Sequence, residues 1–464
     1  MKTQNAYVFA PLLIVMMGMG MIATVSERNE PTKVVHYKRS INETKNSEKV
    51  LLETKVIEKP AAKKEKEKTC VFRTLFGEES SDSNFIYKTP AKVLASADDA
   101  LAWISKAQLN NGGWGAGTHS RQDVFDPHSV KADPATTSMV AMALLRCGNT
   151  PTSGKYSTNL SLATEYLLKQ VENSQDNVTN ITAETGTQPQ RKLGQNIDVV
   201  MTTQYFTNLM DYLNNNPQLK GRVKKSLDIC VAKIQGAQNQ NGSMKGAGWA
   251  GVLQSSFAAN ALESAKEQGI KVDEEKLDKA REYQKNNYDV KNNTSATEDA
   301  AGVMLYSISG SARSSAKEAR VAKDKITKAK REGTLDSKAD VSIENLKKAG
   351  LSDDEAMRYG AAYEINQAAK IQAQRNDVMD GFGSNGGEEF LSYLQTGEGM
   401  IMSKDLEWKK WYDNITGRLV RIQNNDGSWN GHHCITSPVF CTATSLLILS
   451  VTNDVEHLMA QNIK

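Results

Sequence analysis

The sequence predicts an all-α fold in which six helix pairs close into a double-layered ring, an (α/α)6 toroid, behind an apolar segment and a charged linker. Three observations lead to this prediction. A turn motif, Gln-x-x-x-Gly followed two residues later by Trp or Met, recurs along the chain. Each copy is followed by an Ala- and Leu-rich helical pattern, and no stretch shows the alternation of a β-strand. We therefore expect helices throughout the folded body.

The composition is that of an ordinary globular protein with balanced charge. The chain has 464 residues, with 57 Lys and Arg against 54 Asp and Glu, which gives a formal net charge of +3. A net charge this small does not predict a nucleic-acid partner. The five cysteines show no Cys-x-x-Cys spacing, which argues against a disulfide scaffold and a zinc finger.

The first 26 residues are expected to hold a membrane anchor. Tyr7 to Val25 is a run of 19 residues without a charge, close to the roughly 20 that a membrane-spanning helix needs. A cleaved signal peptide is the alternative. Either interpretation exports the rest of the chain, so we expect it to be membrane-anchored and to face the periplasm or cell exterior, or to be secreted after cleavage.

The composition of residues 27–92 predicts a charged, largely disordered tether. Nearly every second residue from Glu27 to Lys68 is charged, and few aromatic residues are present to form a core. Such a segment cannot offset the entropy lost on ordering. The folded body is expected over residues 93–455, with a short tail at 456–464.

The turn motif is complete twice and partial once. Its residues are Gln108, Gly112 and Trp114, then Gln238 and Gly242 with Met244 in place of Trp, then Gln423, Gly427 and Trp429. Each copy ends a polar helix and precedes a more apolar one, which indicates an outer and an inner layer. Three weaker pairs complete the six, at roughly 159–171 with 198–213, 273–286 with 297–309, and 354–376 with 386–396.

These turns and helices resemble the QW-type repeats of the squalene cyclase and protein prenyltransferase β-subunit superfamily, and look most like exported bacterial proteins with prenyltransferase/squalene oxidase repeats. The resemblance covers about residues 94–452. It implies an α/α toroid in which the motif Gln ties the end of one helix to the start of its neighbour, and the Trp stacks on it. It also implies a ligand cavity inside the ring, with acting groups at the amino ends of the inner helices.

The catalytic sets of that superfamily are not found at the expected places. Its cyclases use an Asp-x-Asp-Asp cluster, which this sequence lacks, and its prenyltransferases bind zinc through Asp-x-Cys and a distant His. The one Asp-x-Cys, Asp228 to Cys230, falls in a predicted outer helix. Asp299 and Glu389 stand near predicted inner-helix starts and are the catalytic candidates, although helix capping explains them equally well.

Two loops carry further polar residues. His432, His433, Cys434 and Cys441 are zinc-ligand types, but consecutive side chains diverge. A Cys434–Cys441 disulfide is an alternative in an exported protein, and free buried thiols are another. In loop 118–133, five His and Asp side chains could serve a metal or a proton transfer, but Asp133 before Pro134 also fits a helix cap.

One segment interrupts the repeat. Residues 311–355 contain no aromatic side chain and are dense in Lys, Arg, Glu and Ala. This composition predicts a solvated helical insertion between the fourth and fifth pairs, and a docking surface is the alternative.

The predicted function is a non-catalytic binding or scaffold module that needs no cofactor and engages a protein or an apolar ligand. The alternative is a prenyltransferase- or cyclase-like enzyme that acts on an isoprenoid or other lipid-like substrate, with zinc or acid groups from the candidates above. A plugged ring would favour the first function, whereas a deep aromatic cavity would favour the second.

Overall fold

A computed structural model describes residues 89–381, 386–403, 405 and 407–454. The predicted anchor, most of the tether and the tail lie outside these residues. None of the helices in the described ranges is both long enough and apolar enough to span a bilayer. The expectation of a helical body is confirmed for the described residues, apart from one short antiparallel hairpin of β1 (Tyr288–Asp289) and β2 (Thr294–Ser295), which the sequence analysis missed.

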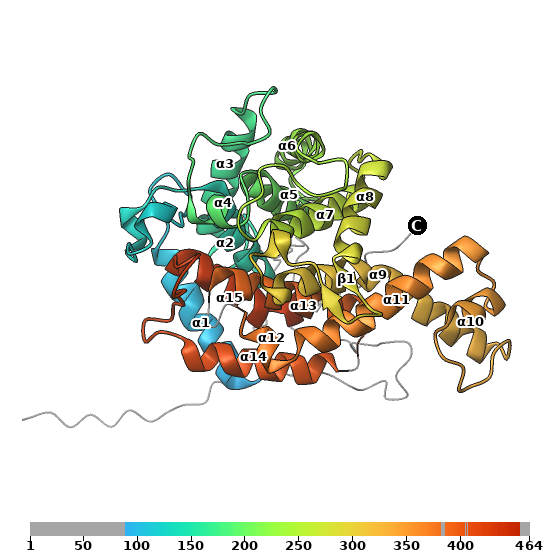
Figure 1. Cartoon of the computed structure of the whole chain (residues 1–464). Coiled ribbons are helices and arrows are strands. Elements are labelled where there is room, and N and C mark those ends of the chain that lie inside the picture. Colours follow the sequence, from blue (N-terminus) through green and yellow to red (C-terminus); the bar gives the residue numbers. More distant parts are fainter. Residues whose placement is uncertain (1–88, 382–385, 404, 406, 455–464) are drawn as a thin grey trace, which may run out of the picture. The chain divides into compact units, whose positions relative to one another are not determined.

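Six inner helices form a closed ring (Figure 1). They are α2 (Pro134–Arg146), α5 (Ile197–Met210), α7 (Gly251–Glu267), α9 (Met304–Arg331), α13 (Gly387–Met402) and α15 (Pro438–Leu449). Each packs against the next, and α15 packs against α2. The helices of the six pairs overlap the predicted ranges, but the fourth inner helix, expected over 297–309, begins at Met304 and continues to Arg331.

Six outer helices surround this ring. They are α1 (Ala91–Lys106), α3 (Ser157–Glu172), α6 (Pro217–Gly236), α8 (Glu274–Asn286), α11 (Asp353–Ala373) and α14 (Trp408–Ile422). Each outer helix packs on the inner helix of the preceding pair, and α1 packs on α15. In Figure 1 the blue first helix accordingly lies beside the red last pair. Both layers therefore join the two ends of the folded body.

Short elements connect the pairs. They are α4 (Gln188–Lys192), α10 (Ile343–Lys348), α12 (Asn376–Met379), and the 3-10 turns η1 (His119–Arg121), η2 (Pro127–Ser129), η3 (Glu298–Ala300) and η4 (Val451–Asp454).

Burial separates the two layers. Every residue of α15 is buried, whereas the outer helix α8 buries only four of its positions. A helix that is apolar or small all round belongs inside, and one with a single apolar stripe belongs outside. Caps define where two inner helices begin: Asp133 and Ser437 each accept a backbone N–H three residues on, and a proline follows each cap.

The motif glutamines join neighbouring outer helices. Gln108, just after α1, donates from Nε2 to the carbonyl of Asn159 in α3 at 2.9 Å. Gln238, just after α6, donates to the carbonyl of Lys276 in α8 at 2.8 Å. Each also donates to the glycine carbonyl of its own turn. One amide thus fixes the turn and attaches it to the next helix.

The third glutamine closes the ring. Gln423 Nε2 donates to the carbonyls of Ser96 and Gly427, both at 2.9 Å, and its Oε1 accepts from Ser96 Oγ at 2.7 Å. We call Gln423, Gly427 and Ser96 the closing clasp. Gly427 has φ 93°, and a Cβ there would lie 2.7 Å from the Asp99 carbonyl oxygen. Only glycine allows this turn to sit directly on α1.

The motif tryptophans hold each turn against the helix before it. Trp114 and Trp429 are completely buried, and their Nε1 atoms donate to the carbonyls of Ile104 and Leu419, both at 2.9 Å. Met244 has no such donor, so the third copy retains the shape of the turn without this bond. Both tryptophans therefore make hydrogen bonds that stabilise the fold.

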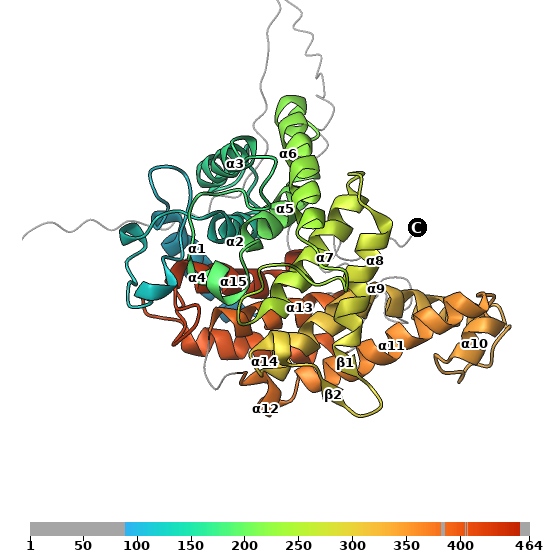
Figure 2. The same ribbon diagram turned by 45° about the horizontal axis from the view of Figure 1, so that its top comes forward.

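The predicted insertion begins later than residue 311. Residues 311–320 belong to the inner helix α9 and are mostly buried, with Arg313 and Lys317 almost completely enclosed. Their charges are paired within the protein, which composition alone cannot reveal. Beyond them, the end of α9, α10 and the start of α11 form an arm with its own small core, to which Ile326, Leu346 and Tyr359 belong. Figure 2 shows this arm to the right of the ring.

Replacing Gln423 with Ala should weaken ring closure. The variant loses two hydrogen bonds across the junction of the first and last helix pairs and one within its own turn, so we expect the free energy of unfolding to fall by about 1–3 kcal/mol. Amide hydrogen exchange should rise in α1 more than in α7. The control is Gln374→Ala, which removes only a bond to Lys370 within its own helix. Equal effects of the two substitutions would contradict a special role for the clasp.

Candidate functional site

Within the part of the chain that the structure describes, a small cavity lies between the inner helices. The cavity between the inner helices has a volume of about 30 Å³, and all six helices contribute to its wall. Its lining residues are Met139, Met142, Arg146, Gln204, Asn208, Phe257, Asn260, Arg313, Leu394, Glu398, Leu447 and Asp454. A space of this size holds about one water molecule.

Ion pairs cross this central space. Arg146 Nη2 lies 2.6 Å from Glu398 Oε1 and 2.7 Å from Asp454 Oδ2. Arg313 Nε lies 3.4 Å from the other oxygen of Glu398. Helices α2, α9 and α13 are thereby joined through buried charges. Removing one partner would leave another charge buried without compensation, which is costly.

A second ionic group extends the first along α7 and α9. Lys317 Nζ lies 3.0 Å from Glu263 Oε2, and Arg281 Nη2 lies 2.5 Å from Glu263 Oε1. Burial alone would raise the pKa of Glu263, but the charges of Lys317 and Arg281 outweigh it and lower this pKa to about 2. The carboxylate is therefore ionised, and this region of the ring is polar.

Titratable side chains meet at the amino ends of α9 and α13, beside the loop before α15. We call Lys192, Tyr306, Glu388, Glu389 and Cys434 the mouth cluster. Glu389 Oε1 accepts from the Tyr306 hydroxyl at 2.8 Å, and its Oε2 accepts from the backbone N–H three residues before it at 2.9 Å. Both glutamates are buried.

The mouth cluster favours the protonated forms of Glu388 and Cys434. Burial, reinforced by the charge of Glu389, raises the pKa of Glu388 to about 8. Burial also raises the pKa of the Cys434 thiol to about 11, with Glu388 adding to the effect. A protonated Glu388 can donate a proton near neutral pH, whereas a protonated thiol is a poor nucleophile.

Lys192 connects the cluster to the surface. Its Nζ lies 3.6 Å from the centroid of the Trp249 ring, an arrangement that stabilises the ammonium group. The edge of His119 approaches the same indole, with ring centroids 6.0 Å apart. Trp249 is nevertheless 64% exposed.

The structure separates the two predicted catalytic candidates. Glu389 lies in the mouth cluster, at the start of α13 as expected. Asp299 lies on η3, is exposed, and accepts a hydrogen bond from Tyr283 of the outer helix α8 at 2.6 Å. The backbone N–H and the Tyr306 hydroxyl engage both oxygens of Glu389, so capping accounts for its position.

The predicted disulfide is not formed in the structure. Cys434 and Cys441 are both free thiols. Cys441 is buried in α15 and its Sγ donates to the Ile435 carbonyl at 3.4 Å, while Cys434 stands in the loop with φ 66°. His432 is exposed and His433 is half-buried. Within the described ranges, no three His, Cys, Asp or Glu side chains are grouped so as to hold a metal ion.

A second pair of buried acids lies between α2 and α5. Asp133 accepts from the Thr136 N–H at 2.7 Å, and Asp198 accepts from the Ala135 N–H at 2.9 Å. Burial raises the pKa of Asp133 to about 6 and that of Asp198 to about 7. The hydrogen bond from the Thr136 N–H shows that Asp133 caps α2, as its position before a proline predicted.

Sequence reasoning missed Lys192 and Tyr306. Lys192 ends the short helix α4, a five-residue element without a periodic pattern. Tyr306 reaches Glu389 across two helices far apart in sequence. The pattern placed residues 297–309 at an inner-helix start, and Tyr306 is the aromatic residue there that could have been singled out.

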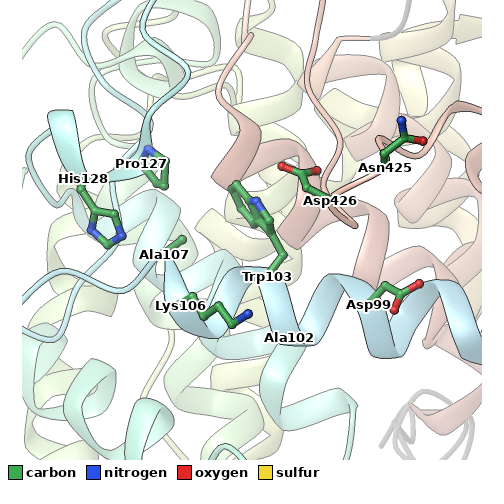
Figure 3. Close-up of a pocket in the computed structure, with 9 residues that line it drawn as sticks. All are labelled: Asp99, Ala102, Trp103, Lys106, Ala107, Pro127, His128, Asn425 and Asp426. Atoms are coloured by element: carbon green, nitrogen blue, oxygen red, sulfur yellow. The ribbon is translucent and has the colours of Figure 1, made fainter. Parts of the chain in front are cut away.

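A much larger hollow, about 450 Å³, lies on the outside between the first and last repeats. We call it the junction groove. Figure 3 shows its lining residues: Asp99, Ala102, Trp103, Lys106 and Ala107 from α1 and the turn after it, Pro127 and His128 from η2, and Asn425 and Asp426 from the last motif turn. Trp103 lies in the middle of this set and is half-buried.

Comparisons with known proteins give only weak similarity. No family model matches the chain, and no curated protein matches it. Among solved structures, the chain is similar to a variant of the type II terpene cyclase MstE from Scytonema in complex with geranylgeranyl dihydroxybenzoate, with 12% identity over 78% of this chain and 98% of that chain and a TM-score of 0.39. For the apo enzyme the identity is 11% and the TM-score 0.33. Similarity at this level assigns neither residues nor activity.

Replacing Glu388 with Gln should make stability less dependent on pH. The native pKa of about 8 exceeds the ordinary value of 4.5, so between these values the folded state holds a proton that the unfolded state has lost. The free energy of unfolding of the parent therefore falls as the pH rises through this window. From pH 5 to pH 9 the variant should lose less stability than the parent, by on the order of a few kcal/mol.

Urea unfolding at pH 5, 7 and 9 measures this difference. Asp133 and Asp198 titrate in the same direction in both proteins and cancel in the comparison. Parallel pH profiles would show that Glu388 is ionised in the native state and would contradict the assignment.

Proposed function

We propose that the chain is a membrane-anchored, extracytoplasmic binding or scaffold module whose ring is a rigid frame and whose partner is bound on its outer surface. The observation that carries this proposal is the central cavity of about 30 Å³. Pockets that hold small molecules usually measure about 300–1,000 Å³. The cavity between the inner helices in the described part of the chain is far below this range.

The chemistry of the interior supports the same conclusion. The guanidinium groups of Arg146 and Arg313 face the space that a substrate would occupy, and Phe257 is the one aromatic residue among those that line it. Enzymes that guide carbocations need aromatic faces, because these attract positive charge. These arginines are paired with Glu398 and Asp454, and such an ionic lining does not suit an apolar chain. A protein partner or another surface-bound ligand fits better than an apolar ligand within the ring.

The proposed location rests on the sequence. The uncharged run from Tyr7 to Val25 is the anchor, and the charged residues up to about 92 hold the ring away from the membrane. Secretion after cleavage of the same segment is the alternative. The proposed function requires no cofactor and no nucleic acid.

One observation favours the enzymatic alternative. Glu388 is buried at the mouth of the ring with a pKa of about 8, which suits a general acid at neutral pH. In that alternative the protein would act on an isoprenoid or similar lipid. The zinc-ligand types His432, His433, Cys434 and Cys441 are not grouped to hold a metal ion in the described part of the chain. The small interior weighs against this alternative.

Isoprenoids should be neither bound nor converted. The full chain in lipid nanodiscs is incubated with geranylgeranyl diphosphate or squalene, with and without zinc, and products are followed by mass spectrometry. We expect no product and no rise in Tm, because the interior has no room for these molecules. A product that appears with the parent and disappears with Glu388→Gln would establish the enzyme instead.

A topology reporter tests the proposed location. Alkaline phosphatase fused to the carboxyl terminus should be active when the chain is expressed in a bacterium, because this enzyme needs the oxidising periplasm. Green fluorescent protein fused at the same place is the matched control and should stay dark after export through the general secretion route. A fluorescent green fluorescent protein fusion together with an inactive phosphatase fusion would contradict an extracytoplasmic ring.

A further inference from the structure

The junction groove contains a tryptophan that the repeat does not need. Trp114 and Trp429 are fully buried and bind helix carbonyls, whereas Trp103 is half-buried in the groove wall. It stands five residues before the motif Gln of its repeat, where the other two copies have Lys233 and Arg418. Since the other two copies accept lysine and arginine there, the repeat itself does not require an indole at this position.

The acidic residue beside it also exceeds what the turn needs. Asp426 Oδ1 accepts from the Ser428 N–H at 3.0 Å and from its hydroxyl at 2.7 Å. Asn111 and Asn241 occupy the same place in the other turns, and each accepts the corresponding N–H at 3.1 Å. An amide oxygen is thus sufficient for the turn. The aspartate provides a further acceptor oxygen and also receives a hydrogen bond from the Trp103 side chain.

The mixed charges around the groove favour a ligand with several polar groups over a simple ion. Asp99 and Asp426 carry negative charge at one side, and Lys106 carries positive charge further along α1 (Figure 3). An isolated anion would be repelled by the carboxylates, and an isolated cation by the ammonium group. A neutral molecule with many hydroxyl groups can donate to the carboxylates and accept from Lys106 and His128 at the same time.

We infer that the junction groove is a binding site for a neutral oligosaccharide, with one sugar ring stacked on the indole of Trp103. This inference rests on the proposed function, since it names the class of ligand that the outer surface takes. The hydroxyl groups of the sugar donate to Asp99 and Asp426 and accept from Lys106. A volume of about 450 Å³ lies within the usual range of small-molecule sites and accommodates a short saccharide.

The closing clasp builds this site in advance. Gly427 presses its turn against the backbone of Asp99, so the wall that contains Asp426 is fixed to the wall that contains Trp103. Side chains held by short hydrogen bonds lose little entropy when a ligand binds. The first and last repeats must meet for the groove to exist.

Calorimetric titration with neutral tetrasaccharides tests the inference. The full chain in nanodiscs is titrated with chitotetraose, cellotetraose and maltotetraose at 50 and 500 mM salt, and tryptophan fluorescence is followed in parallel. We expect at least one of them to bind with a Kd that changes less than twofold between the two salt concentrations. Trp103→Ala should weaken this binding at least tenfold, and Asp99→Ala several-fold.

Trp249→Ala is the matched control, because it removes an exposed tryptophan that does not line the groove. It should leave the affinity for the saccharide unchanged. Asp99 is exposed, so Asp99→Ala reports on the site even if Trp103→Ala fails to fold, and circular dichroism with Tm identifies such a failure.

Three results would overturn the inference: no binding of any of the three saccharides, binding that survives both groove substitutions, or salt-sensitive binding of tetralysine in their place. None of these bears on the filled ring interior. Conversely, turnover of an isoprenoid would overturn the proposed function without testing the groove, so the two failures can be told apart.

Discussion

The hydrogen bonds between Gln423 and Ser96 are the contact on which the ring depends, because they join the last outer helix to the first. A helix pair alone exposes the apolar sides of its inner helix, and only neighbours on both sides can cover them. Closure therefore lets α15 pack on α2 and bury Trp429. The same contact brings the last motif turn against α1 and so creates the junction groove.

Closure also determines what the interior can do. Small residues on the inner helices let them approach closely, and the remaining space is about 30 Å³. Charges that point into this space must be paired there, as Arg146 and Arg313 are with Glu398. Among the described residues, this packing gives a stable frame with a small central cavity. The proposed binding site therefore lies on the outer surface, where side chains can differ between repeats without loss of the fold.

The six helix pairs could be predicted because their signals are local: a turn motif, helical periodicity and a cap such as Asp133. The start of the insertion was placed wrongly because Arg313 and Lys317 resemble solvated residues until their partners are known. Glu389 could be assigned to an inner-helix start, but its contact with Tyr306 joins distant segments and leaves no local pattern. The junction groove was missed for the same reason, since it unites the two ends of the ring.

A crystal structure determined under xenon pressure tests the central claim most directly. Xenon enters apolar cavities larger than a water molecule and marks them by its strong scattering. We predict that no xenon will be found among Met139, Phe257 and Leu394, and that at most one ordered water will occupy the central space. Xenon at that position, or an enlarged cavity with an elongated density, would contradict a filled ring and return the interior to consideration as an active site.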